Sequence, residues 1–146
     1  MTLVAPSSAP LFEWPVRVYW EDTDAGGIVF YANYLKFMER ARTEWLRQRG
    51  VGQQDLAERE GALFVVTASR LRYLGSARLD DSLQVSVEPL ELGRVRLSFR
   101  QRCRLGEQLL CDGQITVACI DRALHRPRRI PQDILARLQP QATTAE

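Results

Sequence analysis

The sequence predicts an α+β domain in which five strands form a mainly antiparallel sheet around one long helix. Three observations lead to this fold class. An apolar stripe at three- and four-residue spacing lies between Asn33 and Gly50, one alternating segment precedes it, and four strand-like segments follow residue 62. A period near 3.6 residues indicates a helix, and a period of two indicates a half-buried strand. The turns are short, which favours antiparallel pairing.

The composition is that of a single globular domain, with 146 residues of which 45% are hydrophobic and 26% charged. We expect this domain to span residues 12–138. Residues 1–11 are expected to be a flexible lead-in and residues 139–146 a flexible tail, because small residues and proline dominate both ends. The net charge of +2 is too small to argue for nucleic acid, so no nucleic-acid partner is expected.

Neither a membrane span nor a secretory signal is expected. No apolar run approaches spanning length, and the first residues lack a basic region and a sustained apolar core. The three cysteines are an odd number without metal-ligand spacing, so we expect no metal site. Reduced, buried thiols in a cytoplasmic protein are the simplest explanation for them.

The longest helix is expected between Asn33, which suits an N-cap, and Gly50, which suits the position after a helix end. Its core-facing residues recur at helical spacing: Leu35, Met38, Ala41, Trp45 and Leu46, with Tyr34 and Phe37 beside them. A shorter helix is expected over 53–60, ending at Gly61. A last helix after Pro131 carries Ile134, Leu135 and Leu138.

Strands are expected at 16–21, 63–74, 82–89, 93–105 and 109–120. One helix cannot cover both faces of a five-stranded sheet, so one face is in water or meets a partner. A long helix wrapped by such a sheet is the hotdog architecture. Because one subunit's sheet encloses the helix only partly, we expect a double-hotdog homodimer or a homotetramer.

The 93–105 segment places five arginines on one strand face: Arg94, Arg96, Arg100, Arg102 and Arg104. The simpler interpretation is a solvated outer sheet face. The alternative is contact with an anionic partner, an acidic protein surface or a membrane.

The chemistry is expected in the segment Glu21-Asp22-Thr23-Asp24-Ala25-Gly26-Gly27, where three carboxylates end a strand. Its two glycines allow close approach of the backbone to a ligand. The helix that follows has free N–H groups at its start, which suit an oxyanion. A thioester fits this arrangement, because its thiolate leaves without a strong general acid.

Asp24, nearest the glycines, is the candidate nucleophile or general base. The backbone N–H of Tyr31 is the candidate donor to the thioester carbonyl. The alternative is that these acids only cap a turn and a helix start. The spacing fits neither an EF-hand nor a phosphate-binding or dinucleotide-binding loop.

Other candidates lie late in the chain. Arg126, Arg128 and Arg129 are the candidate ligands for the phosphates of coenzyme A, because an arginine fork matches phosphate oxygens. His125, the single histidine, is better explained as a surface loop residue than as a catalytic one. The cysteines lack the neighbouring His–Asp pattern of a thiol nucleophile.

The run Val16–Val29 together with Tyr31-Ala32-Asn33-Tyr34 resembles the 4-hydroxybenzoyl-CoA thioesterase family. Within that family the chain is most similar to the acyl-CoA thioesterase branch associated with the bacterial Tol–Pal envelope system. The segments Glu39–Glu44, Ala77–Asp81 and Pro127–Pro131 match as well, so the resemblance covers residues 12–137.

This resemblance implies a hotdog fold, an acyl-CoA substrate and no cofactor. It implies that Asp24 is the catalytic carboxylate and that the amide of Tyr31 polarises the carbonyl. It also implies active sites at the interface of a dimer or dimer of dimers. Many members of the envelope branch have His where this chain has Tyr31. The aryl-CoA branch can carry Tyr, and a backbone amide role survives the change.

The sequence is compatible with three functions. An acyl-CoA thioesterase is favoured. A hotdog dehydratase is disfavoured, because no histidine lies near the long helix. The third is a non-catalytic module of the cell envelope or of lipid synthesis that binds an acyl group or a partner such as acyl carrier protein.

Overall fold

The computed structural model describes residues 3–4 and 10–140. Its elements follow the order β1 (Phe12–Arg17), a 3-10 turn η1 (Trp20–Asp22), α1 (Asn33–Gln48), α2 (Gln53–Glu60), β2 (Ala62–Tyr73), β3 (Ser82–Leu92), β4 (Arg96–Leu105), β5 (Gln108–Asp121) and α3 (Gln132–Leu138). Within the described ranges, none of the helices has the length and apolar character needed to span a bilayer.

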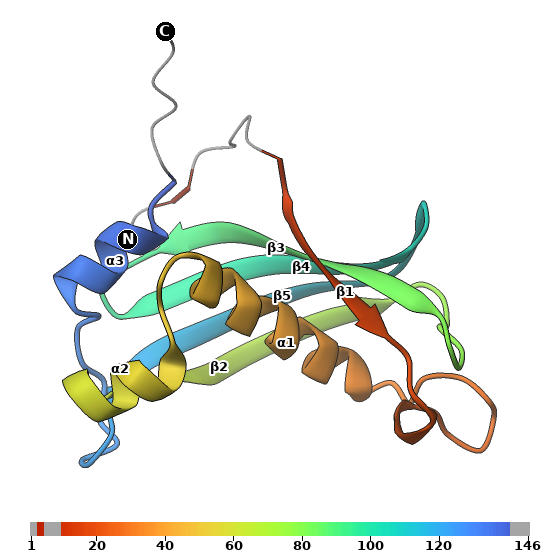
Figure 1. Ribbon diagram of the computed structural model, residues 1–146, viewed down its shortest axis with the longest axis horizontal. Helices are drawn as coiled ribbons and strands as arrows, with labels where there is room; N and C mark the ends of the chain where they lie inside the picture. The colour runs from red at the N-terminus through yellow and green to blue at the C-terminus, as the bar shows by residue number, and fades with distance from the viewer. Residues whose placement is uncertain (1–2, 5–9, 141–146) are drawn as a thin grey trace, which may run out of the picture.

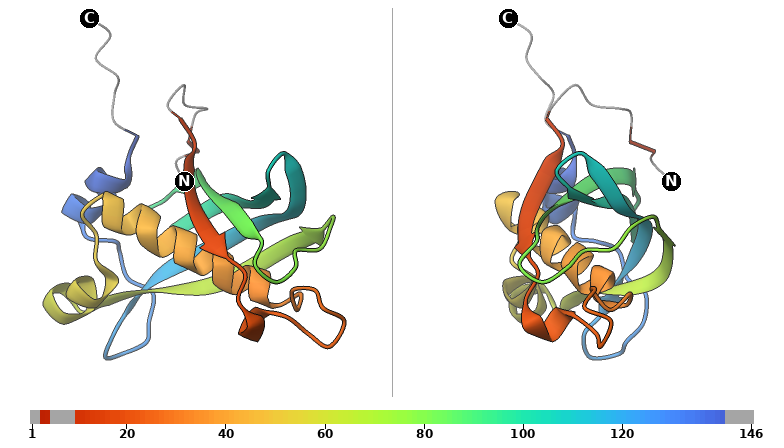
Figure 2. Two further views of the ribbon diagram at one scale, coloured as in Figure 1. Left: turned by 45° about the vertical axis from the view of Figure 1, so that its right-hand side comes forward. Right: turned by 90° about the vertical axis from the view of Figure 1, so that its right-hand side faces the viewer.

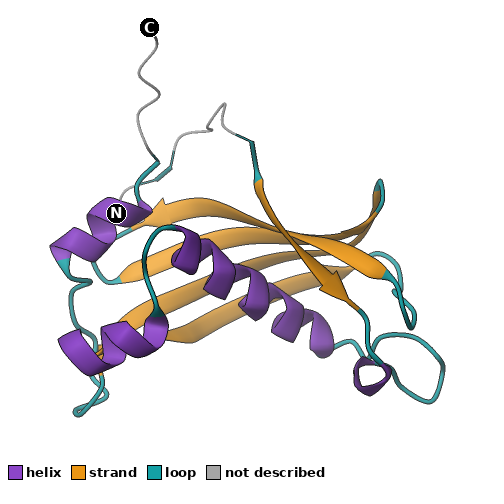
Figure 3. Ribbon diagram, viewed as in Figure 1, coloured by secondary structure: helices purple, strands orange, loops and turns teal. Residues whose placement is uncertain are grey.

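The five strands form one antiparallel sheet in the order β1-β3-β4-β5-β2. The sheet curves around α1, which lies against its inner face (Figures 1 and 2). The short helices α2 and α3 lie near one end of the sheet, and the loop before α1 lies at the other (Figure 3). This arrangement confirms the expected five-stranded sheet and single long helix.

α1 packs mainly on β3, β1 and β4. Its buried side chains are Tyr34, Phe37, Met38, Ala41, Arg42, Trp45 and Leu46. Gly113 on β5 allows the close approach, because a Cβ there would lie 2.8 Å from Cε of Met38. The helix is thereby held against the sheet where β4 and β5 pass beneath it.

The ends of α1 agree with the sequence in part. Gly50 has a φ of 77° just after the helix, as expected. Asn33, expected to cap the helix, is instead its first residue, and its side chain donates to the carbonyl of Asp22 at 2.9 Å. The N-terminus of α1 therefore has no side-chain cap.

The first strand is placed too late by the sequence pattern. The structure has β1 at Phe12–Arg17, and the chain turns through η1 at Trp20–Asp22. Val16 and Val18 are buried as the alternation predicted, but Trp20 is 81% exposed. The two-residue periodicity extended the predicted strand past its true end and into the turn. Trp20 fits the apolar pattern although its side chain is exposed.

A buried polar pair was not predicted. Gln101 on β4 has no exposed surface, and its amide donates to the carbonyl of Met38 at 2.8 Å. Its carbonyl oxygen accepts from Nη1 of Arg42 at 2.9 Å. The pair joins α1 to β4 inside the core.

The three cysteines are free and buried, as expected. Burial raises the pKa of Cys111 to about 12 and that of Cys103 further still, so neither is a thiolate near neutral pH. At the N-terminal end, Leu3 pairs with Glu91 of β3. Residues 1–2, 5–9 and 141–146 lie outside the described ranges, so the flexible lead-in and tail stay predictions.

Candidate active site

The segment from Asp22 to Val29 forms a closed loop between β1 and α1. Thr23 pairs with Val29, and the N–H of Asp24 donates to the carbonyl of Ile28 at 2.9 Å. The 74–81 loop supports it from one side, because Ile28 pairs with Arg78. The loop therefore lies at the N-terminal end of α1, at the lower right of Figure 1.

Asp24 stands at the tight end of this loop and is exposed to solvent. Its Oδ1 accepts from the N–H of Gly26 at 2.8 Å, and its carbonyl accepts from the N–H of Gly27 at 3.0 Å. Gly27 has a φ of 79°, a conformation that favours glycine. Oδ2 has no hydrogen-bond partner among the described residues, so one oxygen is fixed and the other is free to meet a substrate.

The two neighbouring acids, Asp22 and Glu21, lie in different environments from Asp24. Asp22 is buried, and its Oδ2 accepts from the N–H of Tyr19 at 2.8 Å. Its carbonyl accepts from the N–H of Phe30 at 2.9 Å, which ties the loop to the chain before α1. Glu21 is exposed and faces a surface hollow of about 530 Å³, together with Tyr19, Trp20, Leu79 and Asp80. Of the three carboxylates, Asp22 serves the fold and Asp24 is open to a ligand.

The positive end of the α1 helix dipole is not neutralised by a side chain of its first turn. No acidic side chain occupies its first turn, and no side chain caps it. Among the described residues, no acceptor takes the N–H of Tyr31. A partnerless N–H group at a helix start suits a carbonyl or oxyanion oxygen.

Aromatic rings border this end of the helix. The Tyr31 ring lies 4.8 Å from that of Phe30 and 6.0 Å from that of Tyr73, measured between centroids. Tyr73 in turn lies 5.9 Å from Tyr34. Burial, followed by the nearby Cys111 and Tyr31, raises the pKa of Tyr73, so its hydroxyl stays protonated at neutral pH. The rings form an apolar wall beside the Tyr31 amide.

Tyr73 was not identified from the sequence as a site residue. It lies at the end of β2, about forty residues beyond Tyr31 in the chain, and no local motif marks it. Only the pairing of β2 with β5 brings it to the start of α1. A register shift between Val66 and Ala68 changes which residues of β2 face α1, so alternation along the sequence does not assign Tyr73 to a face.

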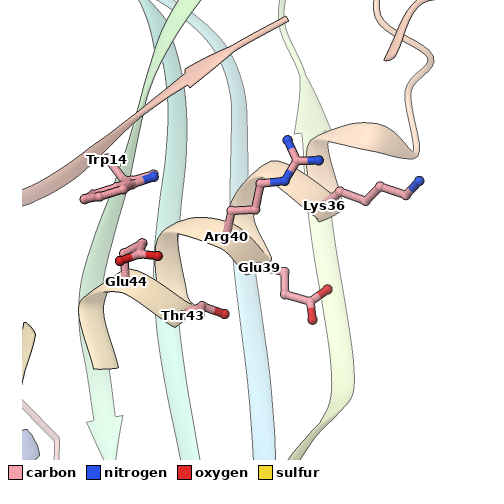
Figure 4. Close-up of a pocket in the computed structure, with 6 residues that line it drawn as sticks. All are labelled: Trp14, Lys36, Glu39, Arg40, Thr43 and Glu44. Atoms are coloured by element: carbon pink, nitrogen blue, oxygen red, sulfur yellow. The ribbon is translucent and has the colours of Figure 1, made fainter. Parts of the chain in front are cut away.

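A second hollow, of about 510 Å³, lies on the solvent side of α1 (Figure 4). It is lined by Trp14, Lys36, Glu39, Arg40, Thr43 and Glu44. Neither Asp24 nor Tyr31 lines it. We therefore do not assign it to the thioester chemistry.

The arginines expected to bind coenzyme A lie far from Asp24 within one chain. They follow β5 in a loop beside the start of β2, where the N–H of Arg122 donates to the carbonyl of Gly61. Tyr73 marks the other end of β2, whose 12 residues span about 40 Å at ~3.3 Å each. One chain does not bring Arg126, Arg128 or Arg129 to the site.

The three arginines of that loop differ in their contacts and exposure. Nη1 of Arg128 donates to the carbonyl of Glu60 at 2.7 Å, at the end of α2. Arg126 and Arg129 are exposed and form no ion pair within the described residues. His125 is exposed in the same loop with a φ of 53°, and the structure does not bring it to Asp24 either.

Comparison with known proteins shows the family of this chain. The family model described as the thioesterase-like superfamily matches residues 18–138. The acyl-CoA thioester hydrolase YbgC of Escherichia coli O6:H1 is 45% identical over 127 residues, which are 86% of this chain and 94% of that protein. The acyl-CoA thioesterase YbgC of Haemophilus influenzae is 42% identical over 125 residues, 86% of this chain and 92% of that protein.

A solved structure gives the same fold. The probable thioesterase from Bartonella henselae is 33% identical, with a TM-score of 0.80, and the match covers 84% of this chain and 100% of that one. The hotdog fold expected from the sequence is confirmed. By its sequence and its architecture, this chain belongs to the thioesterase-like superfamily.

Proposed function

We propose that this protein is an acyl-CoA thioesterase that hydrolyses the thioester to a free acid and coenzyme A, with Asp24 as the reacting carboxylate. The observation that carries the proposal is the loop at the start of α1. It carries a carboxylate with one fixed and one free oxygen, and the chain leads from it into an uncapped helix N-terminus. The close relatives are named as acyl-CoA thioester hydrolases, which supports the same reaction here.

Asp24 has two chemical routes. As a nucleophile, its free oxygen attacks the thioester carbonyl, the C–S bond breaks, the thiolate takes up a proton, and water then cleaves the acyl–aspartyl anhydride. As a general base, Asp24 takes a proton from the water that attacks the carbonyl. In both routes the negative charge develops on the carbonyl oxygen, and the Tyr31 N–H is the group that we propose stabilises it.

The proposal includes a dimer formed along β2. This strand is one edge of the sheet, it is 12 residues long, and it contains no proline, whereas the other edge, β1, has six residues with Pro15 among them. Val66 on its inner face is 51% exposed. A long unpaired edge with exposed apolar side chains favours pairing with a second copy.

Such a dimer explains the position of the arginines. Symmetric pairing of two β2 edges is antiparallel, so the Ala62 end of one copy lies beside the Tyr73 end of the other. The arginine loop is at the Ala62 end, and Tyr73 contacts Tyr31. In this dimer Arg126 and Arg129 of the second copy lie at the Tyr73 end of β2, and we propose that they bind the phosphates of coenzyme A there.

We place the enzyme in the cytoplasm, in keeping with its free, buried thiols. The activity is tested by following thiol release from short-chain, long-chain and aromatic acyl-CoA substrates. Turnover of at least one substrate class is expected. If the protein instead retains acyl-CoA or acyl carrier protein without releasing thiol from any of these substrates, the non-catalytic binding module is the correct function.

A further inference from the structure

The outer face of the sheet carries a cluster of arginines that the thioester chemistry does not use. We call it the arginine face: Arg70 and Arg72 on β2, and Arg96, Arg100, Arg102 and Arg104 on β4. Two arginines of β2 and two of β4 pair with the same residues of β5, so they lie on the same face of the sheet. Arg72, Asp112 and Arg102 form one row across three strands, and Arg70, Gln114 and Arg100 form the next. The inner residues of β4, Leu97, Phe99, Gln101 and Cys103, are buried, so these arginines point away from α1.

The charge of this surface is unbalanced. On the outer face of β5, the strand between β2 and β4, Asp112 is the one acid, and it already pairs with Arg100 at 3.1 Å and Arg102 at 3.5 Å. Within residues 3–4 and 10–140, Arg70, Arg72 and Arg104 form no ion pair. The other acids of the outer face, Glu13, Glu88 and Glu91, lie on β1 and β3. The half of the face next to the β2 edge is therefore strongly cationic.

The shape and composition of the arginine face narrow the choice of partner. The large exposed apolar residues lie on loops, at the chain start or on the helix side, so the face lacks the apolar centre of a protein interface. The hollows at Trp14 and at Trp20 are lined by other residues, so nothing suggests a small-ligand pocket here. Face-to-face contact between two copies would oppose like charges.

We propose that the arginine face binds an anionic phospholipid surface, which holds the protein at a membrane while the thioester site on the opposite side of the sheet stays open. Clustered basic residues next to an anionic bilayer each contribute to adsorption without any apolar insertion. The inference does not require thioesterase activity. Pairing along β2 would place the cationic halves of two copies side by side and strengthen the binding to the membrane surface.

The test is co-sedimentation of the full chain with phosphatidylglycerol vesicles, with phosphatidylcholine vesicles as the neutral reference, at about 0.1 M salt. The test variant is Arg70→Gln/Arg72→Gln. The matched control is Arg47→Gln/Arg59→Gln, which removes the same charge from exposed positions on α1 and α2. A third variant, Arg70→Lys/Arg72→Lys, keeps the charge but not the arginine fork.

Binding to phosphatidylglycerol but not to phosphatidylcholine is expected, and it should weaken as salt rises. Each basic residue near an anionic surface is worth roughly fivefold in affinity, so the test variant should bind about 25-fold more weakly. The control and the lysine variant should bind like the wild type. Equal weakening by the control would show a net-charge effect and overturn the proposal. Absence of binding to phosphatidylglycerol vesicles also overturns the proposal. This holds even if the protein binds an acidic protein.

Discussion

Three carboxylates within four residues occupy different environments, and these environments separate their roles. Asp22 is buried and accepts the N–H of Tyr19, Glu21 faces a surface hollow, and Asp24 keeps one oxygen free beside the start of α1. The sequence predicted the segment and favoured Asp24 within it, and the role of Asp24 stays a prediction. The sequence did not indicate that Asp22 is structural, because that depends on a hydrogen bond formed only when the chain turns at η1.

Removing the buried carboxylate should weaken the fold. Asp22→Ala leaves the N–H of Tyr19 without its acceptor, which should lower the free energy of unfolding by about 1–3 kcal/mol. Turnover should fall as well, because the loop that holds Asp24 loses a support. Urea denaturation and steady-state kinetics measure both effects. A variant with an unchanged unfolding midpoint would show that Asp22 does not support the loop.

At the scale of elements, α1 is held by apolar packing and by one buried polar pair. Gln101 joins β4 to both Arg42 and the carbonyl of Met38. Burial lowers the pKa of Arg42, since the protein interior disfavours its charge. Removing Gln101 therefore leaves a guanidinium in the core with one hydrogen bond fewer.

This coupling is measurable. Gln101→Leu should destabilise the protein by about 1–3 kcal/mol through loss of hydrogen bonds to buried groups. In the double variant Arg42→Met/Gln101→Leu, the cation is removed together with its partner. The cost should then be smaller than the sum of the two single variants, as expected for residues in contact. Additive costs in denaturant melts would show that the pair is not coupled.

Two carboxylates on β5 predict how stability depends on pH. Hydrogen bonding and charge from Arg100, then Arg102, lower the pKa of Asp112. The N–H groups of Leu124 and Ala123 lower that of Asp121. Because both folded pKa values lie below the unfolded value near 4, their stabilisation is present above that pH and is lost as the pH falls through the folded values.

Stability should therefore hold from neutral pH to about pH 4 and decline below it. Asp112→Asn should make the loss between pH 4 and pH 2 less steep. Thermal melts across this range measure the effect. A wild type and variant with parallel pH profiles would exclude Asp112 as a source of the acid sensitivity.

The elements themselves were largely predictable from the sequence. Gly50 and Gly61 marked helix ends because positive φ angles favour glycine, and period-two alternation located β3, β4 and β5. The sheet order and the Gln101–Arg42 pair were not predictable, because both depend on contacts between distant segments. Alternation within β4 placed Gln101 on the apolar face but did not indicate why a polar residue belongs there.

At the scale of the whole molecule, the proposed site is shared between two copies. Asp24 and the arginine loop lie at opposite ends of β2 in one chain. In the dimer that we propose, antiparallel pairing along this edge brings them together. The sequence predicted a dimer from the incompletely covered helix, and the long β2 edge is the edge that we propose for it.

Mixing variants tests this sharing. Asp24→Asn and Arg126→Gln/Arg129→Gln should each be impaired with acyl-CoA. Subunit exchange between them should restore turnover, because one of the two sites in each mixed dimer is intact. Hydrolysis of acyl-pantetheine, which lacks the nucleotide phosphates, should be unaffected by the arginine variant. A mixture no more active than its components would place both groups in the same chain or exclude the arginines.

The central claim is that Asp24 carries the hydrolysis, and its most direct test compares two variants that remove the same charge from the Glu21–Gly27 segment. The measurement is kcat for thiol release from the best acyl-CoA substrate, with circular dichroism as the check on folding. Asp24→Asn should lower kcat by at least about a hundredfold, the range of a lost general base or nucleophile. Glu21→Gln, three residues away and also exposed, should stay within about twofold of the wild type. A folded Asp24→Asn variant with normal turnover would contradict the account.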